Sequence, residues 1–286
     1  MTLGRKLRSR LQKPDILNAP GIFDSLSALL AEQAGFEAIF LSGSSVAYSQ
    51  IARPDIGLVT MTEMADACAR ITDRVNIPVL VDIDSGFGNA AHAGRTLRVM
   101  EQAGAAAVQI EDQQPVKNAN ALSGRPLVST DVMVDKIKAL TDDRRSIDCL
   151  ISARSDAPAT EPLSKIIERV ARYCEAGADL VFAEGLTDSD HIKQIVAAAD
   201  GTPVIFNLLH AGRKISSSRQ LQDLGVSVAL YPGNAILSAA NAMKSAFAQL
   251  ADKPELPKEG FALTPKEFNE TLGTPELIER YKDFAS

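Results

Sequence analysis

Acidic residues stand at the ends of several short apolar runs, and their spacing is the first feature that could support chemistry. Asp82 and Asp84 end one run, and Glu111 ends the next. Residues two apart on a regular strand face the same side, so these carboxylates could meet. Six or more acids at such ends would repel one another unless a cation joined them. Oxygen ligands without clustered His or Cys favour Mg²⁺, or Mn²⁺, over zinc.

An alternative explanation gives the same acids structural roles. An aspartate at the end of a strand often caps the following helix, or it pairs with an arginine such as Arg154, which ends a later run. For any single acid both explanations stay open. The set taken together favours the metal.

Two further features could bind an organic acid. The planar guanidinium of Arg154 can hold a carboxylate through two hydrogen bonds. The run Ser42-Gly43-Ser44-Ser45 offers backbone N–H and hydroxyl donors, although such a run is also an ordinary strand-to-helix turn. Together with a metal, these groups predict a small 2-oxo or 2-hydroxy acid substrate and an enolate formed from it.

Eight apolar runs would position these residues, and amphipathic stretches, several of which end in glycine, lie between them. This alternation favours a closed (β/α)8 TIM barrel, with the active site at the C-terminal ends of its strands. An open doubly wound sheet is the alternative. We expect the barrel to span residues 1–250 and a helical extension to span 251–286, after a Pro-rich connection. The expected strands are 16–24, 37–43, 77–84, 106–112, 148–156, 179–185, 203–209 and 226–233.

The composition narrows the classes of partner. The 286 residues carry a net charge of −6, so we expect no binding to nucleic acid or to an anionic membrane surface. The basic N-terminus has no apolar segment behind it and does not resemble a signal peptide. Three cysteines without CxxC spacing suggest buried thiols in a reducing compartment. We therefore expect a cytoplasmic protein.

Several strings resemble the isocitrate lyase and phosphoenolpyruvate mutase superfamily: SGSSVA followed by RPDIG, then VDIDSGFGN, IEDQ, ISARSDA and FAEG. The resemblance covers nearly the whole chain and is closest in general texture to the methylisocitrate lyase-like branch. It implies a TIM barrel, and commonly a homotetramer, a dimer of dimers whose helix after the barrel is exchanged between subunits.

The resemblance also implies roles for individual residues. Asp82 and Asp84 would bind Mg²⁺ directly or through water, with Glu111 as a further contact. Arg154 would bind the substrate, and Asp55 would lie on a loop over the site. The remaining predicted substrate contacts are Ser42, Gly43, Ser44, Glu184 and Asn207.

The chain departs from that branch at two places. Where the branch carries K-[KR]-C-G-H, with a Cys that acts in proton transfer, this chain has Lys117, Asn118, Ala119, Asn120 and Ala121. A methyl group has no titratable proton, so general acid catalysis from that position is lost. Where branch members usually read N-x-T-E, His210 stands at the fourth position. His210 could be a general acid, or simply part of the pocket wall.

Three hypotheses about function follow. The first is a Mg²⁺-dependent lyase or decarboxylase that cleaves a C–C bond of a small 2-oxo or 2-hydroxy dicarboxylate. The second is a mutase or phosphonopyruvate hydrolase acting on a P–C bond, with Lys117 and Asn120 contacting the phosphonate. The third is a catalytically impaired homologue that binds a metabolite.

Overall fold

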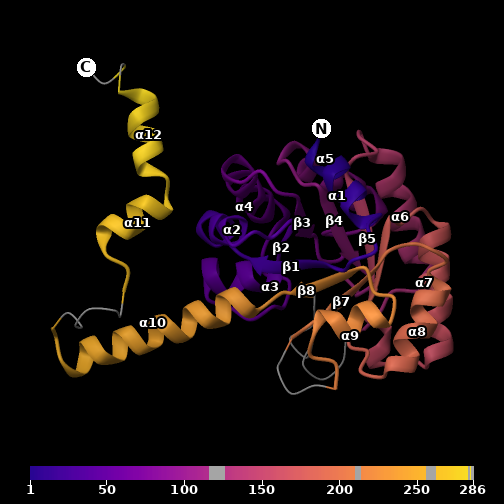
Figure 1. Ribbon diagram of the computed structural model, residues 1–286. Coiled ribbons are helices and arrows are strands. Elements are labelled where there is room, and N and C mark those ends of the chain that lie inside the picture. The colour runs from indigo at the N-terminus through magenta and orange to yellow at the C-terminus, as the bar shows by residue number, and fades with distance from the viewer. Residues whose placement is uncertain (116–125, 210–213, 256–261, 283, 285–286) are drawn as a thin grey trace. The chain divides into compact units, whose positions relative to one another are not determined.

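The computed structural model describes residues 1–115, 126–209, 214–255, 262–282 and 284 (Figure 1). Eight parallel strands form a closed barrel in the order of the chain. The barrel closes where Leu17 of the first strand pairs with Val228 of the last, which excludes the open sheet. The strands are β1 (Leu17–Ile22), β2 (Ile39–Leu41), β3 (Val79–Asp82), β4 (Ala107–Glu111), β5 (Leu150–Ser155), β6 (Leu180–Ala183), β7 (Val204–Asn207) and β8 (Val228–Tyr231).

All eight strands lie inside the predicted runs, because apolar residues on both faces of a strand suit a parallel sheet that is covered on both sides. Alternate residues, among them Phe40, Leu80 and Phe182, form one buried cluster that fills the barrel. Their neighbours, such as Val81 and Val181, join a second cluster with the surrounding helices.

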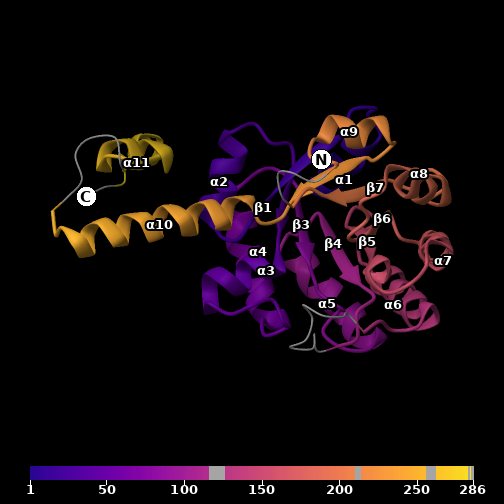
Figure 2. The same cartoon turned by 90° about the horizontal axis from the view of Figure 1, so that it is seen from below.

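Within residues 1–237, most of the helices lie around the outside of the strands (Figure 2). Several begin with a side-chain cap, as at Thr60, which shares a capping box with Glu63. The helices are α1 (Leu3–Leu11), α2 (Ser25–Gln33), α3 (Gly43–Val46), η1 (Ala47–Ile51), α4 (Met61–Arg74), α5 (Ala90–Gln102), α6 (Thr130–Asp143), η2 (Ala157–Ala159), α7 (Leu163–Glu175), α8 (Ser189–Ala198), α9 (Ser218–Asp223), α10 (Asn234–Asp252), α11 (Pro265–Thr271) and α12 (Thr274–Tyr281).

The chain divides into two units by its internal contacts, Met1–Leu237 and Ser238–Ser286. The sequence placed this division at residue 250, where the Pro-rich connection begins. The contacts place it earlier because Ile236 is the only buried residue of α10 among those described. Helices α11 and α12 lie within residues 251–286, for which a helical extension was predicted.

Two smaller expectations concern membranes and thiols. Within the described ranges, no helix combines the length and the apolar character that crossing a membrane requires. Cys68, Cys149 and Cys174 are free, with the first two buried and the third half-buried. Burial raises the pKa of Cys68 and of Cys149 to about 12, so both thiols stay protonated near neutral pH.

Candidate active site

The inward-facing side of the strands brings the predicted polar residues to one end of the barrel. Each lies two positions beyond a residue of the barrel interior, and this period places it on the same face. Below Glu111 and Arg154 the interior itself is polar, since Gln109 and Ser152 are buried there. The residues that reach the mouth in this way are Ser42, Asp82, Glu111, Arg154, Glu184 and Asn207.

Arg154 is surrounded by carboxylates. Its Nη2 donates to Asp156 Oδ1 at 2.8 Å and lies 3.7 Å from Glu184 Oε2, while its Nε lies 3.5 Å from Glu111 Oε2. Among the described residues, the buried Nε has no hydrogen-bond acceptor. Although burial opposes the charged form, the carboxylates of Asp156, Glu111 and Glu184 raise the pKa of Arg154. The guanidinium therefore stays charged, with one donor left for a ligand.

Phe182 and Asn207 complete the surroundings of Arg154. The guanidinium carbon lies 5.3 Å from the centre of the Phe182 ring, a favourable cation–π distance. Asn207 Nδ2 donates to Glu184 Oε2 at 2.6 Å, so Glu184 is held from the side of β7. Glu184 and Asn207, two of the predicted substrate contacts, thus lie on the same side of the mouth as Arg154.

The turn after β3 sets the direction of Asp84. The sequence argument put Asp82 and Asp84 on one regular strand, but β3 ends at Asp82 and Asp84 has a φ of 46°. The Asp84 backbone N–H donates to Asp82 Oδ1 at 3.0 Å. The expectation that both aspartates lie on one regular strand is therefore wrong, because a turn follows Asp82 and positions Asp84.

Glycine makes this turn possible. Gly86 (φ 85°) and Gly88 (φ 152°) follow Asp84 in conformations that L side chains rarely adopt. A Cβ atom at Gly86 would lie 2.8 Å from the Cβ of Ala93, and one at Gly88 would lie 2.6 Å from the ring of His92. In the DSGFG string, the glycines are thus needed for the backbone conformation of the turn, and the aspartate supplies the carboxylate.

The Ser42–Ser44 segment uses its donors partly within the protein. Gly43 N–H donates to Asp82 Oδ2 at 3.3 Å, and the hydroxyls of Ser42 and Ser44 are hydrogen-bonded at 3.0 Å. Ser42 also caps α3 through the backbone N–H of Ser45. The backbone of the segment therefore lies against Asp82, one of the predicted metal ligands.

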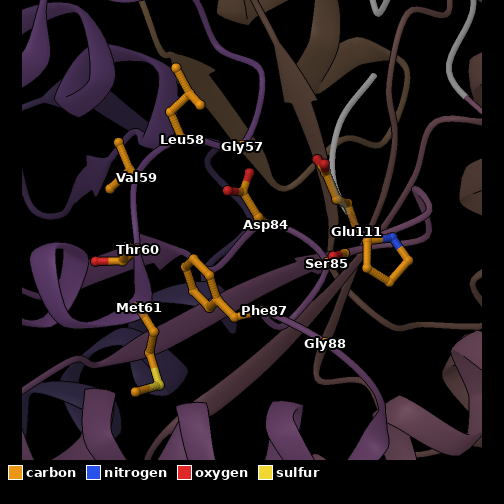
Figure 3. A pocket seen from close by; sticks show the side chains of 11 residues that line it. Gly57, Leu58, Val59, Thr60, Met61, Asp84, Ser85, Phe87, Gly88 and Glu111 are labelled. Carbon is orange, nitrogen blue, oxygen red and sulfur yellow. The ribbon is translucent and has the colours of Figure 1, made fainter. Parts of the chain in front are cut away.

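A pocket of about 350 Å³ opens between the loop before α4 and the turn after β3 (Figure 3). Asp84 and Glu111 line it, together with apolar side chains that include Leu58 and Phe87. Figure 3 shows Asp84 between Leu58 and Val59 on one side and Glu111 on the other. Asp55 is half-buried on the adjoining loop but is absent from the described residues that line the pocket.

Several acids that were expected at the mouth have structural roles instead. Asp24 is exposed and forms a capping box at the start of α2. Asp112 points away from the mouth into a buried network, where it accepts from Ser155 Oγ at 2.7 Å and from Tyr173 Oη at 2.8 Å. Arg169 Nη1 lies 3.3 Å from the same carboxylate. The structural alternative thus holds for these two aspartates, because helix caps and buried donors satisfy them locally.

The three predicted metal ligands stay a prediction. Within the described part of the chain, no three His, Cys, Asp or Glu side chains are grouped closely enough to hold a metal ion by themselves. Asp82 and Glu111 are nonetheless buried carboxylates at neighbouring strand ends, and Glu111 lines the pocket together with Asp84. Mg²⁺ commonly keeps several waters and uses only one or two carboxylates, so this oxygen-only donor set fits a hydrated Mg²⁺ ion.

Lys136 of α6 lies beside the site although its position in the sequence did not predict this. This lysine is almost fully buried, and its Nζ donates to the backbone oxygen of Ser85 at 2.8 Å, just after Asp84. Burial lowers the pKa of Lys136, and the carboxylates of Asp112 and Glu111 oppose that shift. A lysine in an amphipathic helix is expected on the surface, so the sequence did not predict this buried contact.

Three predicted site residues, Lys117, Asn120 and His210, lie outside the described residues. The other two histidines, His92 and His191, are exposed near helix starts. The described polar groups of the mouth therefore come from β2 to β7 and from the turn after β3.

A closed (β/α)8 barrel with carboxylates and one arginine at the C-terminal ends of its strands has the design of a barrel enzyme. Comparison with known proteins identifies the family. The phosphoenolpyruvate phosphomutase family model matches residues 7–251, and the chain belongs to this family.

Two relatives and two solved structures show the range of this likeness. A 2-methylisocitrate lyase from Aeropyrum pernix is 39% identical over 251 residues, 87% of this chain and 80% of the relative. A 2,3-dimethylmalate lyase from Eubacterium barkeri is 34% identical over 288 residues, 100% of this chain and 99% of the relative. A crystal structure of 2,3-dimethylmalate lyase, described as a member of the PEP mutase/isocitrate lyase superfamily, has a TM-score of 0.92 at 29% identity and covers 100% of this chain and 96% of its own.

A phosphonopyruvate hydrolase in complex with oxalate and Mg²⁺ has a TM-score of 0.90 at 28% identity, with 100% of both chains covered. The predicted superfamily, the TIM barrel and the enzyme class, a carbon–carbon lyase of this superfamily, are confirmed.

Proposed function

We propose that the protein is a Mg²⁺-dependent lyase or decarboxylase that cleaves a C–C bond of a small 2-oxo or 2-hydroxy dicarboxylate. The observation that carries this proposal is the combination of buried carboxylates with Arg154 at the mouth, where the Nε of Arg154 has no hydrogen-bond acceptor among the described residues. Excess negative charge calls for a cation, and the free donor suits an anionic substrate. The lyases among the relatives support the reaction type.

The proposed cofactor is Mg²⁺, held by Asp82, Asp84 and Glu111 partly through water. Mn²⁺, with the same preference for oxygen ligands, is the alternative ion. The neighbouring hydrolase structure with Mg²⁺ supports this assignment. When bound, the ion would polarise the oxygen on the substrate's second carbon and stabilise an enolate.

The side chains of this chain would bind and orient the substrate. Arg154 Nε, which lies 3.5 Å from Glu111 Oε2, would donate to one carboxylate of the substrate. The hydroxyls of Ser42 and Ser44 are hydrogen-bonded to each other, and the Gly43 backbone between them contacts Asp82; these groups would contact the other end of the substrate. Glu184 and Asn207 would flank the group that leaves, and Asp55 would contact the substrate from its loop.

The sequence of the segment after β4 narrows the reaction. The methylisocitrate lyase-like branch has Cys and His in this segment. The corresponding residues here, Ala119 and Ala121, provide no proton donor. Loss of CO₂ from a 2-oxo dicarboxylate forms an enolate, and this step needs no proton donor. Among the candidate reactions, decarboxylation therefore depends least on acid–base groups in this segment. Lys117, Asn120 and His210 are the proposed groups for proton transfer or closure of the site.

The test is turnover of a panel of 2-oxo and 2-hydroxy dicarboxylates by the purified protein with Mg²⁺, with release of a 2-oxo acid or CO₂ as the readout. We expect at least one member to turn over, and chelation of the metal to stop the reaction. Absence of turnover across the panel with both Mg²⁺ and Mn²⁺ would overturn the proposal.

A second candidate is cleavage or rearrangement of a P–C bond, which the likeness to the phosphonopyruvate hydrolase structure favours. Loss of phosphonopyruvate, followed by ³¹P NMR, is the deciding measurement. A third is a metabolite-binding protein without activity. Stabilisation by Mg²⁺ and oxalate without turnover on either panel would select that candidate.

We also propose a homotetramer, a dimer of dimers. Within the unit Ser238–Ser286, the described residues form no buried core, although Phe247, Leu277 and Ile278 are large apolar side chains. Helices with such unburied apolar residues suit packing against another subunit. Light scattering should give four times the 30.5 kDa mass of the chain. The free thiols support a cytoplasmic location.

A further inference from the structure

The direction of the Arg154 guanidinium depends on which carboxylate holds it. Asp156 makes the short contact of 2.8 Å, whereas Glu111 and Glu184 lie at 3.5 and 3.7 Å. All three could accept from the same guanidinium. A group that fixes Asp156 therefore decides how the other N–H groups of Arg154 face the mouth.

Asp156 is fixed at three points. Its Oδ1 accepts from Arg154, its Oδ2 accepts from Gln113 Nε2 at 2.7 Å, and its backbone N–H donates to Asp112 Oδ1 at 2.9 Å. Asp156 is 1% exposed and Gln113 4%, so water cannot readily replace either partner. Removing the amide would leave one carboxylate oxygen of Asp156 buried without that donor.

Gln113 is suited to this task by its charge and by its backbone. Its amide donates without adding a positive charge, so Asp156 keeps its full attraction for Arg154. Its backbone is held by an antiparallel bridge to Leu127, next to Val128, whose N–H donates to the backbone oxygen of Asp112. The side chain therefore extends from a fixed point.

We propose that Gln113 is a positioning residue, which holds Asp156 so that Asp156 orients the guanidinium of Arg154 towards the substrate's carboxylate. The inference rests on the proposed function, since it assumes that Arg154 binds that carboxylate. Its chain of contacts is Gln113 to Asp156 to Arg154.

The experiment compares Gln113→Met with Gln114→Met in the full-length protein. Methionine keeps the length and removes the donor. Gln114 is the exposed neighbour, so its variant controls for the substitution itself. Calorimetry with Mg²⁺ and oxalate should show about tenfold weaker oxalate binding for Gln113→Met, the usual scale for a lost hydrogen bond to a charged group. Gln114→Met should bind like the wild type.

A purely structural role would lower the thermal midpoint and leave oxalate affinity unchanged well below that temperature. Gln113→Asn serves as the second variant, because its amide is one methylene too short to reach Asp156. If both Gln113 variants bind oxalate within twofold of Gln114→Met, the inference is overturned and the proposed function stands. If the wild type neither binds oxalate nor turns over any substrate, the proposed function itself has failed.

Discussion

The two halves of the barrel mouth hold their charges in different ways. On the arginine side, made of Glu111, Arg154, Asp156 and Glu184, side chains hold one another in ion pairs and hydrogen bonds. On the aspartate side, made of Ser42, Gly43, Asp82 and Asp84, backbone N–H groups and a turn hold the carboxylates. We propose that the first side receives an anion and that the second, where Asp84 lines the pocket, receives a cation.

The difference shows how one site can receive ligands of opposite charge. Paired side chains set the position of a guanidinium without using all its donors. Backbone donors hold a carboxylate without bringing a competing positive charge. Substitutions on the arginine side should therefore affect stability and substrate together, whereas those on the aspartate side should affect the metal first.

The largest effect is expected for Arg154→Met. Removing the guanidinium leaves Glu111, Asp156 and Glu184 as uncompensated acids, at a cost of about 3–5 kcal/mol in the free energy of unfolding. We expect kcat/KM to fall at least about a hundredfold, because the anion receptor is lost. Denaturant unfolding and steady-state kinetics measure the two effects. Unchanged stability would show that the three acids do not depend on Arg154.

The aspartate side is tested by Asp84→Asn. The substitution keeps the size of the side chain and removes its charge, so Mn²⁺ affinity should fall about tenfold or more, on the scale seen when support of a metal site is lost. Stability should change little. Asp24→Asn is the matched control, because Asp24 also follows a strand but caps α2, and asparagine caps equally well. Equal Mn²⁺ affinity in the two variants would remove Asp84 from the metal site.

The network behind the arginine side is tested by Tyr173→Phe. This change removes the hydrogen bond to the Asp112 carboxyl, which also pairs with Arg169, and should lower the free energy of unfolding by about 1.5–3 kcal/mol. Tyr231→Phe is the control, since Tyr231 donates to the neutral amide oxygen of Asn18 and should cost only about 1 kcal/mol. Chemical denaturation of both variants measures the difference. A larger loss for Tyr231→Phe would contradict the charged-network account.

The smallest effect concerns pH. The hydrogen bonds from Arg169 hold the pKa of Glu161 below its ordinary value of 4.5, so the folded state favours the ionised form. This stabilisation is present above pH 4.5 and is lost as the pH falls through the lowered pKa. Glu161→Gln should therefore lose less stability between pH 5 and 3 than the wild type does, by about 1 kcal/mol or less. If the free energy of unfolding fell equally with pH in both proteins, the Glu161–Arg169 pair would not contribute to the pH dependence of stability.

Many residues at the mouth could be predicted from the sequence because strand period and strand ends are local features. Glu111, Arg154 and Glu184 follow apolar runs, and the inward face of each run fixes the direction of its last polar residue. Asp24 and Asp112 follow runs too, yet one caps a helix and the other faces α7. A position at a strand end therefore predicts where the mouth of the barrel lies. It does not predict which of the acids at strand ends point into the mouth.

The sequence by itself determined the eight strands, the family strings and the residue types at the strand ends, because apolar periodicity and local motifs specify them. Only the tertiary structure decided that Asp84 points from a left-handed turn, that Lys136 lies buried under that turn, and that Gln113 holds Asp156. These contacts join residues far apart in the chain or follow from backbone angles. Burial away from water strengthens the electrostatic interaction in each contact. The extent of burial depends on the whole fold, so no local sequence pattern predicts it.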